Sequence, residues 1–482
     1  MNVLHASSEV HPYSKSGGLA DMVAALAKSL AKAGHQVGLV TPLYQGIAKQ
    51  YPALEKLQGG LDLPLGPSRV QGEIWTLHPL DGLTIYFVDQ PQFFDRLGLY
   101  QENGCDYPDN PERFIFFSKA VAHVARHLAS HPDIIHVHDW QAGLVPVLTL
   151  HQRKTEGWRN APRTCLTIHN VAYQGNFSRA QYDLTNLPFD FFNPEGVEFY
   201  GGLNCLKAGI AYADAITTVS PRYAREITTE AFGCGLDGIL RHRQNILAGI
   251  LNGVDYEEWK TVSNPYLRHS YDLRNLGGKA AEKLELQAQL GLPVDPAIPL
   301  FGTVSRLVAQ KGVDILLGAL EEMLASNMQF VLLGSGLPVF ESAFQSLAAR
   351  FPTKVAVRIG FDQGLSHRVE AACDFYLMPS AFEPCGLNQM YSLCYGTIPI
   401  VRRTGGLDDS VIDPGENADE ANGIKFTEYS TRALAKAIRK ALVLYEHPDL
   451  LSHFRKNAMK ADFSWKRTTE EYVSVYRNIL EP

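Results

Sequence analysis

Short runs rich in β-branched and aromatic residues alternate with stretches of helical periodicity along almost the whole chain. Such alternation is typical of α/β proteins with parallel sheets. The first half has expected strands at residues 2–7, 36–41, 84–88, 134–138, 164–168 and 215–219. The second half has them at residues 247–251, 300–304, 329–333, 355–359, 375–379 and 398–401. Because about six strands make one doubly wound domain, the sequence predicts an α/β fold with two doubly wound, Rossmann-like domains.

The boundary between the two halves is predicted at Asn252-Gly253. Asn-Gly is a turn signal, and a long polar stretch with Pro265 follows it before periodicity resumes. Near the end of the chain, Ser464 can cap a last helix, whose apolar positions recur at helical spacing at Tyr472, Tyr476 and Leu480. The sequence thus predicts an N-terminal domain, a C-terminal domain and a final helix at residues 1–251, 252–461 and 462–482.

Charge and cysteine usage narrow the class of protein. The 482 residues include 44 Lys and Arg against 51 Asp and Glu, for a net charge of −7, which argues against broad binding to nucleic acid or to anionic membranes. The seven scattered cysteines never form a C-x-x-C pair, and no basic segment precedes an apolar run at the N-terminus. We therefore expect a cytoplasmic protein with reduced thiols. The oligomeric state stays open.

A glycine pair follows the first expected strand, at Lys15-Ser16-Gly17-Gly18, and a helix is expected from Leu19. Two glycines let backbone N–H groups approach an anion, and Lys15 adds a full positive charge. The motif is not G-x-G-x-x-G, so no dinucleotide fingerprint is present. A tight turn with a solvated lysine is the alternative.

Two cations follow the expected strand at 300–304, where Arg306 and Lys311 flank a turn. Ligands of open α/β sheets bind at strand carboxyl ends, and this pair of cations suits a diphosphate. A solvated basic turn is the alternative.

The loop Pro379–Gln389 follows a buried strand and places Glu383 two residues before Cys385-Gly386-Leu387. Its N–H groups could bind a phosphate, and its carboxylate could bind a polyol or a cation. Glu383 could instead stabilise the turn only.

Two histidine motifs follow strands of the first half, in His136-Val137-His138-Asp139 and Thr167-Ile168-His169-Asn170. H-x-H puts two imidazoles on one strand face, so a metal site has to be considered, but no third ligand is visible nearby. His169 is the better candidate for a transition-state hydrogen-bond donor, with a hydrogen-bonded strand-end histidine as the alternative. Most aromatic residues near Phe94 and Phe191 are expected in the core, although such faces can also stack on sugars.

Several motifs occur in a fixed order along nearly the whole chain: Lys15-Ser16-Gly17-Gly18-Leu19, His138-Asp139-Trp140, Thr167-Ile168-His169-Asn170, Asn252-Gly253-Val254-Asp255, Ser305-Arg306-Leu307, Glu383-Pro384-Cys385-Gly386-Leu387 and Thr404-Gly405-Gly406-Leu407. In these motifs the chain resembles the bacterial glycogen synthases of the starch-synthase type, retaining glycosyltransferases whose two Rossmann-like domains face each other across a cleft (GT-B). The resemblance implies transfer of glucose from ADP-glucose to the non-reducing 4-OH of an α-1,4-glucan, such as glycogen or a maltooligosaccharide. It also implies an acceptor side in the N-terminal domain, a donor side in the C-terminal domain, and a last helix that returns to the N-terminal domain.

The resemblance also implies roles for individual residues. Lys15, Gly17 and Gly18 would hold the donor, and His169 would stabilise an oxocarbenium-like transition state. Asp139 and Asn170 would line the same cleft. Arg306 and Lys311 would neutralise the diphosphate. Glu383 would bind the glucose hydroxyls beside Cys385, Gly386 and Leu387, and Phe361 would stack on adenine. No metal or other cofactor is expected, because Lys and Arg would do the work that a metal does in other transferases.

Some positions depart from the family pattern. Ala381 and Cys394 stand where basic residues are usual, and Tyr391 stands where many other retaining transferases have a second Glu. The preference for ADP-glucose over UDP-glucose is left open. Two rival functions remain, a glucan phosphorylase with a pyridoxal-phosphate lysine and a glucan-binding scaffold without turnover.

Overall fold

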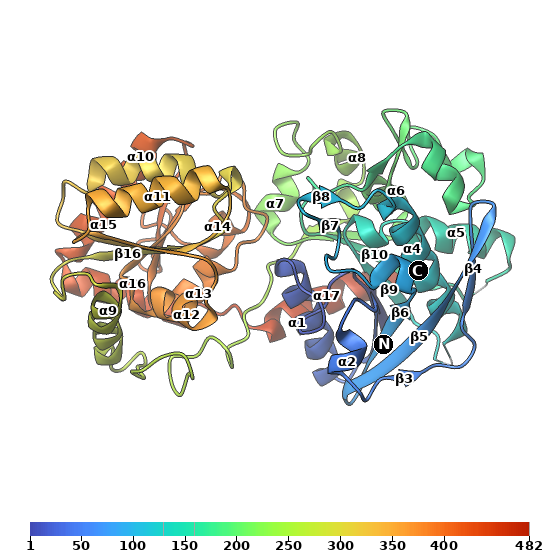
Figure 1. Ribbon diagram of the computed structural model, residues 1–482, viewed down its shortest axis with the longest axis horizontal. Helices are drawn as coiled ribbons and strands as arrows, with labels where there is room; N and C mark the ends of the chain where they lie inside the picture. The colour runs from blue at the N-terminus through green and yellow to red at the C-terminus, as the bar shows by residue number, and fades with distance from the viewer. Residues whose placement is uncertain (129, 159, 482) are drawn as a thin grey trace. The chain divides into compact units, whose positions relative to one another are not determined.

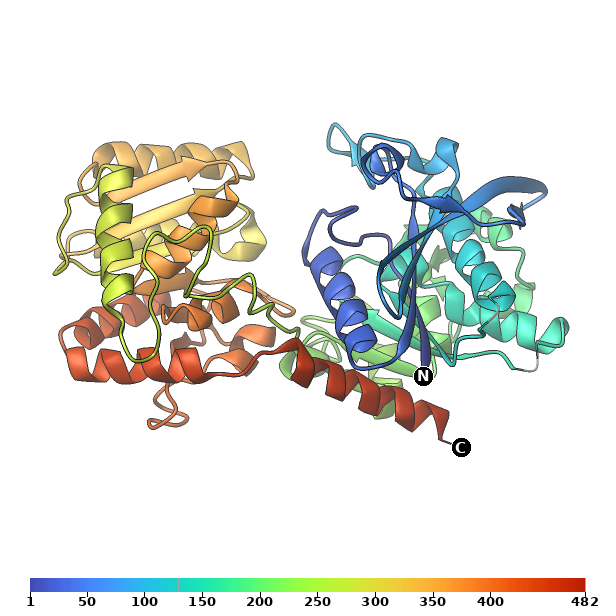
Figure 2. The ribbon, with the colours of Figure 1, turned by 90° about the horizontal axis from the view of Figure 1, so that it is seen from below.

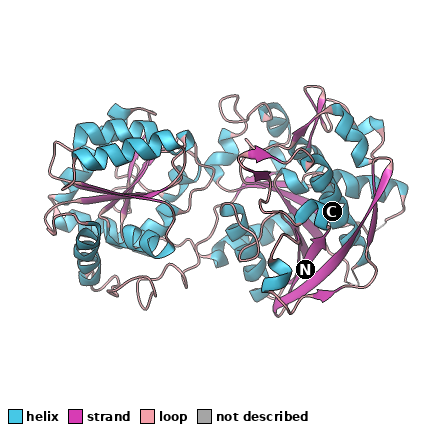
Figure 3. Ribbon diagram, in the orientation of Figure 1, coloured by secondary structure: helices cyan, strands magenta, loops and turns pink. Residues whose placement is uncertain are grey.

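The computed structural model describes residues 1–128, 130–158 and 160–481, which divide into two compact units (Figure 1). The first unit contains Met1–Gly253 and the C-terminal segment from Trp465, and the second contains Val254–Ser464. In each unit a central sheet is covered by helices, as Figure 3 shows with strands in magenta and helices in cyan. The fold class predicted from the sequence is therefore confirmed. No helix of the described segments is long and apolar enough to cross a membrane.

The sheet of the first unit has ten strands, and those from β15 to β6 are parallel. In spatial order the strands are β15 (Leu247–Gly249), β14 (Ala215–Thr218), β10 (Arg163–Ile168), β9 (Ile134–His138), β1 (Asn2–Ala6), β2 (Gln36–Pro42), β6 (Leu83–Asp89), β5 (Ser68–Leu80) and β3 (Glu55–Lys56), with β4 (Leu61–Leu65) paired to β5. The chain order reverses between β1 and β9, which makes that gap the topological switch point of the sheet.

Two features of this sheet correct the sequence analysis. The run at 247–251, expected in the second half, forms β15 beside β14, and Ile250 N–H donates to the Thr218 carbonyl at 2.8 Å. The antiparallel strands β3, β4 and β5 were not predicted. They were missed because antiparallel strands can be joined without a crossover helix. Such strands lack the strand–helix alternation on which the prediction relied.

Helices cover both faces of the first sheet. The helices of the first unit are α1 (Gly18–Lys32), α2 (Ile47–Gln50), α3 (Pro91–Phe94), α4 (Asn110–His127), α5 (Val145–Thr155), α6 (Cys205–Tyr212), α7 (Pro221–Glu226), α8 (Asp237–His242) and α17 (Trp465–Leu480). Short strands make a three-stranded sheet and a hairpin: β11 (Asn176–Phe177), β13 (Gly202–Asn204) and β12 (Glu198–Phe199), then β7 (Gln101–Glu102) and β8 (Cys105–Asp106). Near the two positions named in the sequence analysis, Phe94 is buried, as expected, whereas Phe189, two residues before Phe191, is exposed.

The C-terminal helix α17 lies beside α1 in the first unit (Figure 2). Its Thr469 hydroxyl is 2.7 Å from the Ser29 hydroxyl of α1. Tyr472 and Tyr476 are fully buried, as their helical spacing predicted, but Leu480 in the last turn is 38% exposed. The buried tyrosines therefore attach α17 to the sheet of the first unit.

The second unit has a six-stranded parallel sheet. Its spatial order is β18 (Val355–Ile359), β17 (Gln329–Gly334), β16 (Leu300–Val304), β19 (Phe375–Met378), β20 (Ile398–Arg402) and β21 (Ile424–Phe426). In chain order this is 3-2-1-4-5-6, so the switch point lies between β16 and β19. The three-residue β21 was not predicted.

The helices of the second unit are α9 (Gly277–Leu290), α10 (Val313–Met323), α11 (Pro338–Arg350), α12 (Gln363–Ala372), α13 (Asn388–Cys394), α14 (Gly405–Ser410), α15 (Thr431–Tyr445) and α16 (Pro448–Lys460). One hydrophobic core joins α10, α11 and α15 to one face of the sheet, and a smaller one joins α9 and α12 to the other (Figure 1).

The chain passes between the units twice, at Gly253–Val254 and at Ser464–Trp465. Gly253 lies so close to Trp465 that a Cβ would come within 2.7 Å of the indole ring, so the Asn-Gly sequence fits this contact. In the second unit the Val254 N–H donates to the Phe463 carbonyl at 2.7 Å.

Candidate active site

Polar loops follow the strands on either side of both switch points. In the first unit they come after β1 and β9, and a further loop follows β10, the neighbour of β9; we call Lys15, Gly17, Gly18, Asp139, His169 and Asn170 the first-unit edge. In the second unit they come after β16 and β19, and we call Arg306, Lys311 and Glu383 the second-unit edge. The carboxyl ends of parallel strands lie at the same edge of a sheet. Open α/β sheets bind their ligands at that edge.

Glu383 and Lys311 form an ion pair at the second-unit edge. The Lys311 Nζ lies 2.6 Å from Glu383 Oε2, and the Ser380 hydroxyl donates to the same oxygen at 3.0 Å. Glu383 is only 6% exposed, and none of the described residues donates to its Oε1. The carboxylate is thus fixed through one oxygen, which leaves the other able to accept from a ligand hydroxyl.

The loop that carries Glu383 is held by the glycine pair before α14. Gly405 has a φ of +43°, and a Cβ there would lie 1.9 Å from the Glu383 carbonyl oxygen. The Gly406 N–H donates to the carbonyls of Glu383 and Pro384 at 3.2 and 3.0 Å. Only glycine fits this approach, so the Thr404-Gly405-Gly406 motif supports the Glu383 loop.

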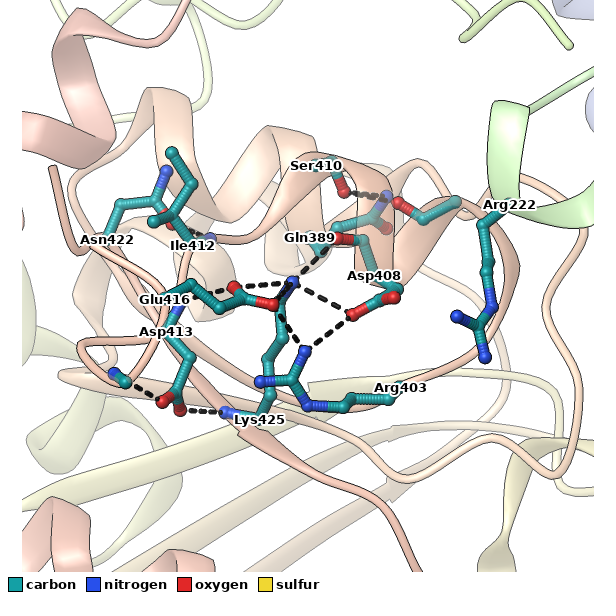
Figure 4. A network of polar contacts seen from close by, with 12 residues as sticks. Arg222, Gln389, Arg403, Asp408, Ser410, Ile412, Asp413, Glu416, Asn422 and Lys425 are labelled. Carbon is teal, nitrogen blue, oxygen red and sulfur yellow. Dashed lines mark hydrogen bonds and ion pairs between the residues drawn. The ribbon is translucent and has the colours of Figure 1, made fainter.

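A network of ion pairs holds α14 in place through Asp408. Figure 4 shows the Lys425 ammonium between Asp408 and Glu416, and Arg403 reaching the same two carboxylates. Lys425 also donates to the Asp408 carbonyl at 2.7 Å, while its side chain is 2% exposed. Burial alone would raise the pKa of Glu416, but hydrogen bonds from Arg403 and Lys425 lower that pKa to about 2. The network therefore stays charged down to acidic pH.

Arg306 differs from its neighbours because its side chain is exposed. Within the described segments its guanidinium has no hydrogen-bond or ion-pair partner. The Gly334-Ser335-Gly336 loop packs on the backbone beside Arg306, because a Cβ on Gly334 would lie 2.0 Å from the Ser305 carbonyl. The glycines of this loop thus allow its backbone to pack closely against the backbone at Ser305. The guanidinium is left available to an anion.

The other residues expected on the donor side have distinct surroundings. Phe361 is 80% exposed and follows Gly360, which has a φ of +122°. Cys385 is buried, Gly386 has a φ of +70°, and Leu387 precedes α13. Gln389 Nε2 donates to the carbonyls of Cys385 and Gly386 at 3.1 and 3.0 Å, which fixes this turn.

A carboxylate absent from our sequence-based site, that of Glu9, lies at the first-unit edge. It accepts from the Ser16 hydroxyl at 2.6 Å and from the Gly17 N–H at 3.3 Å, and the Tyr100 hydroxyl donates to it at 2.7 Å. Lys15 Nζ lies 2.8 Å from the carboxylate of Asp21 in α1. The expected anion loop before Gly18 therefore already has two acidic partners. A substrate anion would have to exchange with them.

Asp139 connects β9 to β10. Its φ is +56°, which is unusual for a residue other than glycine, and its Oδ1 accepts from the His169 N–H at 2.7 Å. Burial raises the pKa of Asp139 to about 7, against hydrogen bonds from the amides of His169 and Asn170, and the charge of Glu9 adds to the rise. Asn170 itself closes a turn through Oδ1, which accepts from the Ala172 N–H at 3.1 Å. The structure thus brings Asp139, His169 and Asn170 together.

The H-x-H histidines have a third imidazole beside them, from His5. His5 pairs in register with His136 across β1 and β9, and side chains two residues apart share a face, so His5, His136 and His138 cluster on one side of the sheet. His136 contacts the hydroxyls of Tyr476 and Thr167 at 2.7 and 2.6 Å. Every ring nitrogen of the three except His5 Nε2 has a hydrogen-bond partner. These contacts already use the nitrogens that a metal would need.

The position of His5 beside His136 could have been predicted from the strand order. A doubly wound order places the first and fourth strands side by side, which would have put His5 next to His136. Glu9 had no such signal, because its partners Ser16 and Tyr100 approach it only through the folding of two loops.

Two family models match the chain. Residues 2–242 match the starch synthase catalytic domain, and residues 283–461 match the glycosyl transferases group 1. A glycogen synthase of Anaeromyxobacter sp. (strain Fw109-5) is 46% identical over 100% of both chains, and that of Myxococcus xanthus (strain DK1622) is also 46% identical over 100% of both.

Two solved structures resemble the chain. The catalytic domain of starch synthase IV from Arabidopsis thaliana, bound to ADP and acarbose, has a TM-score of 0.89 at 32% identity and covers 100% of this chain and 99% of its own. The sucrose-phosphate synthase of Thermosynechococcus elongatus, at 18% identity and a TM-score of 0.61 over 99% and 98% of the two chains, shares the fold.

Proposed function

This chain belongs to the starch synthase family of glycosyltransferases, and from that membership we propose that it is a glycogen synthase. The enzyme transfers glucose from ADP-glucose to the non-reducing 4-OH of an α-1,4-glucan, with retention of configuration. The observation that carries the proposal on the structural side is the pairing of Lys311 with Glu383 beside the exposed Arg306. The ADP and acarbose bound by the Arabidopsis relative support a nucleotide donor and a glucan acceptor.

The second-unit edge suits the departing diphosphate. Arg306 offers a fork of donors that has no partner among the described residues, and Lys311 adds a point charge. Both cations would stabilise the negative charge that grows on ADP as the glycosidic bond breaks. We therefore propose that the reaction needs no bound metal.

Glu383 suits the glucose of the donor. Its Oε2 is held by Lys311 and Ser380, so Oε1 can accept from a sugar hydroxyl. An ion-paired carboxylate is a poor nucleophile, and we therefore assign Glu383 to binding and to charge stabilisation. Retention would then follow from attack by the acceptor on the face that the diphosphate leaves.

Apart from Lys15, the first-unit edge suits uncharged parts of the reactants. Burial lowers the pKa of His169 to about 3, so its imidazole is neutral at physiological pH. A neutral ring can hydrogen-bond a sugar hydroxyl or the transition state without repelling the positive charge that develops at the anomeric carbon. Asp139 would orient His169 through its backbone N–H. Lys15 would meet the donor phosphates after leaving Asp21.

The exposed ring of Phe361 supports ADP as the nucleotide. Its face is large enough to stack on adenine, and we expect kcat/KM for ADP-glucose to exceed that for UDP-glucose by about tenfold or more. The scattered cysteines support a reducing compartment, and we propose that the enzyme works in the cytoplasm.

The test is a transfer assay with the purified chain, ADP-glucose and glycogen. We expect ADP release in step with lengthening of the glucan, unchanged by EDTA, and removal of the added glucose units by a hydrolase specific for α-1,4 linkages. Glu383→Gln protein serves as the control for contaminating activity. Absence of glucan extension by folded protein would contradict the proposal, as would transfer from glucose 1-phosphate with pyridoxal phosphate bound.

A further inference from the structure

Three imidazoles form a continuous chain from the first-unit edge into the core. His169 Nε2 lies 3.2 Å from His138 Nδ1, and His138 Nε2 lies 3.2 Å from His5 Nδ1. His5 and His138 are fully buried, and His5 Nε2 ends the chain with no partner among the described residues. Only His169, at the other end, reaches the edge of the sheet.

All three rings are neutral at physiological pH. Burial lowers the pKa of His5 and of His169 to about 3, and burial with the neighbouring imidazoles lowers the pKa of His138 well below its usual value. A neutral imidazole has one N–H and one bare nitrogen. Two hydrogen bonds in series therefore allow only two arrangements, in which all the N–H groups point toward His169 or all point toward His5.

The buried end of the chain chooses between these arrangements. If the N–H groups pointed inward, His5 Nε2 would carry a proton with no acceptor, and buried N–H groups without partners are rare. If they point outward, His5 Nε2 keeps a bare lone pair, and His169 presents Nδ1–H at the edge. A bare acceptor is the less costly defect.

We propose that His138 and His5 are positioning residues that fix His169 as the Nδ1–H tautomer, so that it meets the substrate as a neutral hydrogen-bond donor. The inference rests on the proposed function, in which His169 faces the reacting glucose. His138 would act only through His169, and His5 only through His138. The group that would accept the hydrogen bond from His169 Nδ1–H is an oxygen of the donor sugar.

The groups around the chain are compatible with this arrangement. His136 lies beside His5 and His138, with ring centroids 4.9 and 4.3 Å away and the rings tilted, but its own nitrogens contact the Tyr476 and Thr167 hydroxyls. Tyr476 comes from α17, so the C-terminal helix closes the cluster. At the edge, the carboxyl of Asp139 accepts from the backbone N–H of His169 and leaves the ring to His138.

Proton positions test the proposal directly. Neutron diffraction from deuterium-exchanged wild-type crystals should place deuterium on Nδ1 of His5, His138 and His169 and leave Nε2 of each bare. Deuterium on Nε2 of His169 would overturn it, and so would a metal ion bound among His5, His136 and His138 after soaking in Zn²⁺. This result does not depend on activity, so it stands even if the transfer assay fails.

A matched pair of variants tests the consequence for the reaction. In His138→Asn the amide nitrogen can take the place of Nδ1 and donate to His169, whereas in His138→Gln the amide takes the place of Nε2 and that donor is lost. We expect kcat of His138→Gln to be lower than that of His138→Asn by about tenfold or more, with little change in KM for ADP-glucose, because tautomer control affects the reacting state.

His136→Gln is the control, because His136 is equally buried but does not contact His169. It should lower Tm while kcat stays near that of the wild type. Equal kcat values for the two His138 variants would overturn the proposal. So would a rise in the KM of His138→Gln for ADP-glucose without a fall in its kcat. If neither variant folds, the neutron positions decide.

Discussion

The two units carry polar groups at the same place on the same kind of sheet, yet the groups differ in charge. Buried imidazoles with low pKa values, hydrogen-bonded to one another, support the first-unit edge. At the second-unit edge, Lys311 is paired with a buried carboxylate and Arg306 is exposed. Strand order thus fixes where a doubly wound domain binds, and burial and charge decide what it binds.

Lys15 is the exception in this comparison, as a cation at the first-unit edge. Its partner Asp21 is 32% exposed, so the pair is a surface ion pair that contributes little to stability. If Lys15 meets a substrate phosphate, as we propose, its exchange with Asp21 has a low cost.

The largest effect is expected for Glu383→Gln at the second-unit edge. The amide keeps the shape but leaves Lys311 without a counter-charge, and kcat should fall by about 100-fold or more because the loss falls on the transition state. Initial rates of ADP release measure this. Ser380→Ala removes one hydrogen bond to the same oxygen and should cost far less. Near wild-type turnover by folded Glu383→Gln would refute the role of the carboxylate.

A smaller effect is expected for Arg306. Arg306→Gln should lower kcat/KM for ADP-glucose by about tenfold or more, and Arg306→Lys should recover part of it, since a point charge replaces a bidentate fork. Steady-state kinetics with glycogen at saturation separate the three proteins. Identical values for Lys and Gln variants would mean that charge at this position is unimportant.

The next effect concerns pH and the first-unit edge. The pKa of Asp139, which burial raises to about 7, means that the carboxyl takes up a proton as the pH falls through neutrality. If the ionised form orients His169, kcat/KM should fall below pH 7 in the wild type and be flat over that range in Asp139→Asn. A wild-type profile without this limb would show that the protonation of Asp139 does not matter.

The smallest effect is expected for stability at Glu416. Its folded pKa is lowered from 4.5 to about 2, so its contribution to stability is complete above pH 4.5 and is lost as the pH falls toward 2. Glu416→Gln should therefore lower Tm slightly at neutral pH, and the difference from the wild type should shrink between pH 4.5 and 2. Thermal unfolding followed by circular dichroism measures it. A difference that grows with acid would have the wrong sign.

Strand–helix alternation predicted the parallel strands of both sheets except β21, but it did not predict the antiparallel edge of the first sheet. All twelve expected runs coincide with strands, because buried parallel strands are continuous apolar segments. The ribbon of β4 and β5 has one polar face, and such short alternations resemble loop sequence. The run at 247–251 was counted with the strands of the second half, although it lies before the boundary predicted at Asn252, because its pairing with β14 is a long-range contact.

Polar residues at the strand ends were predictable where one loop carries them. Glu383 and Lys311 were both expected, but their 2.6 Å contact joins two loops and had no signal in either. The same holds for Glu9, and for His5 at the end of the imidazole chain. Residue types at strand ends can be recognised in a sequence, whereas the partners that set their charge come from packing.

The central claim is that the second-unit edge binds the diphosphate while the histidines of the first-unit edge act on the sugar. Calorimetric titration with ADP alone, which lacks the sugar, separates these roles in Arg306→Gln and His169→Gln. The account predicts that Kd for ADP rises by about tenfold or more in Arg306→Gln and stays within about twofold of the wild type in His169→Gln, although both lose turnover. Equal weakening of ADP binding in the two variants, or none in Arg306→Gln, would contradict it.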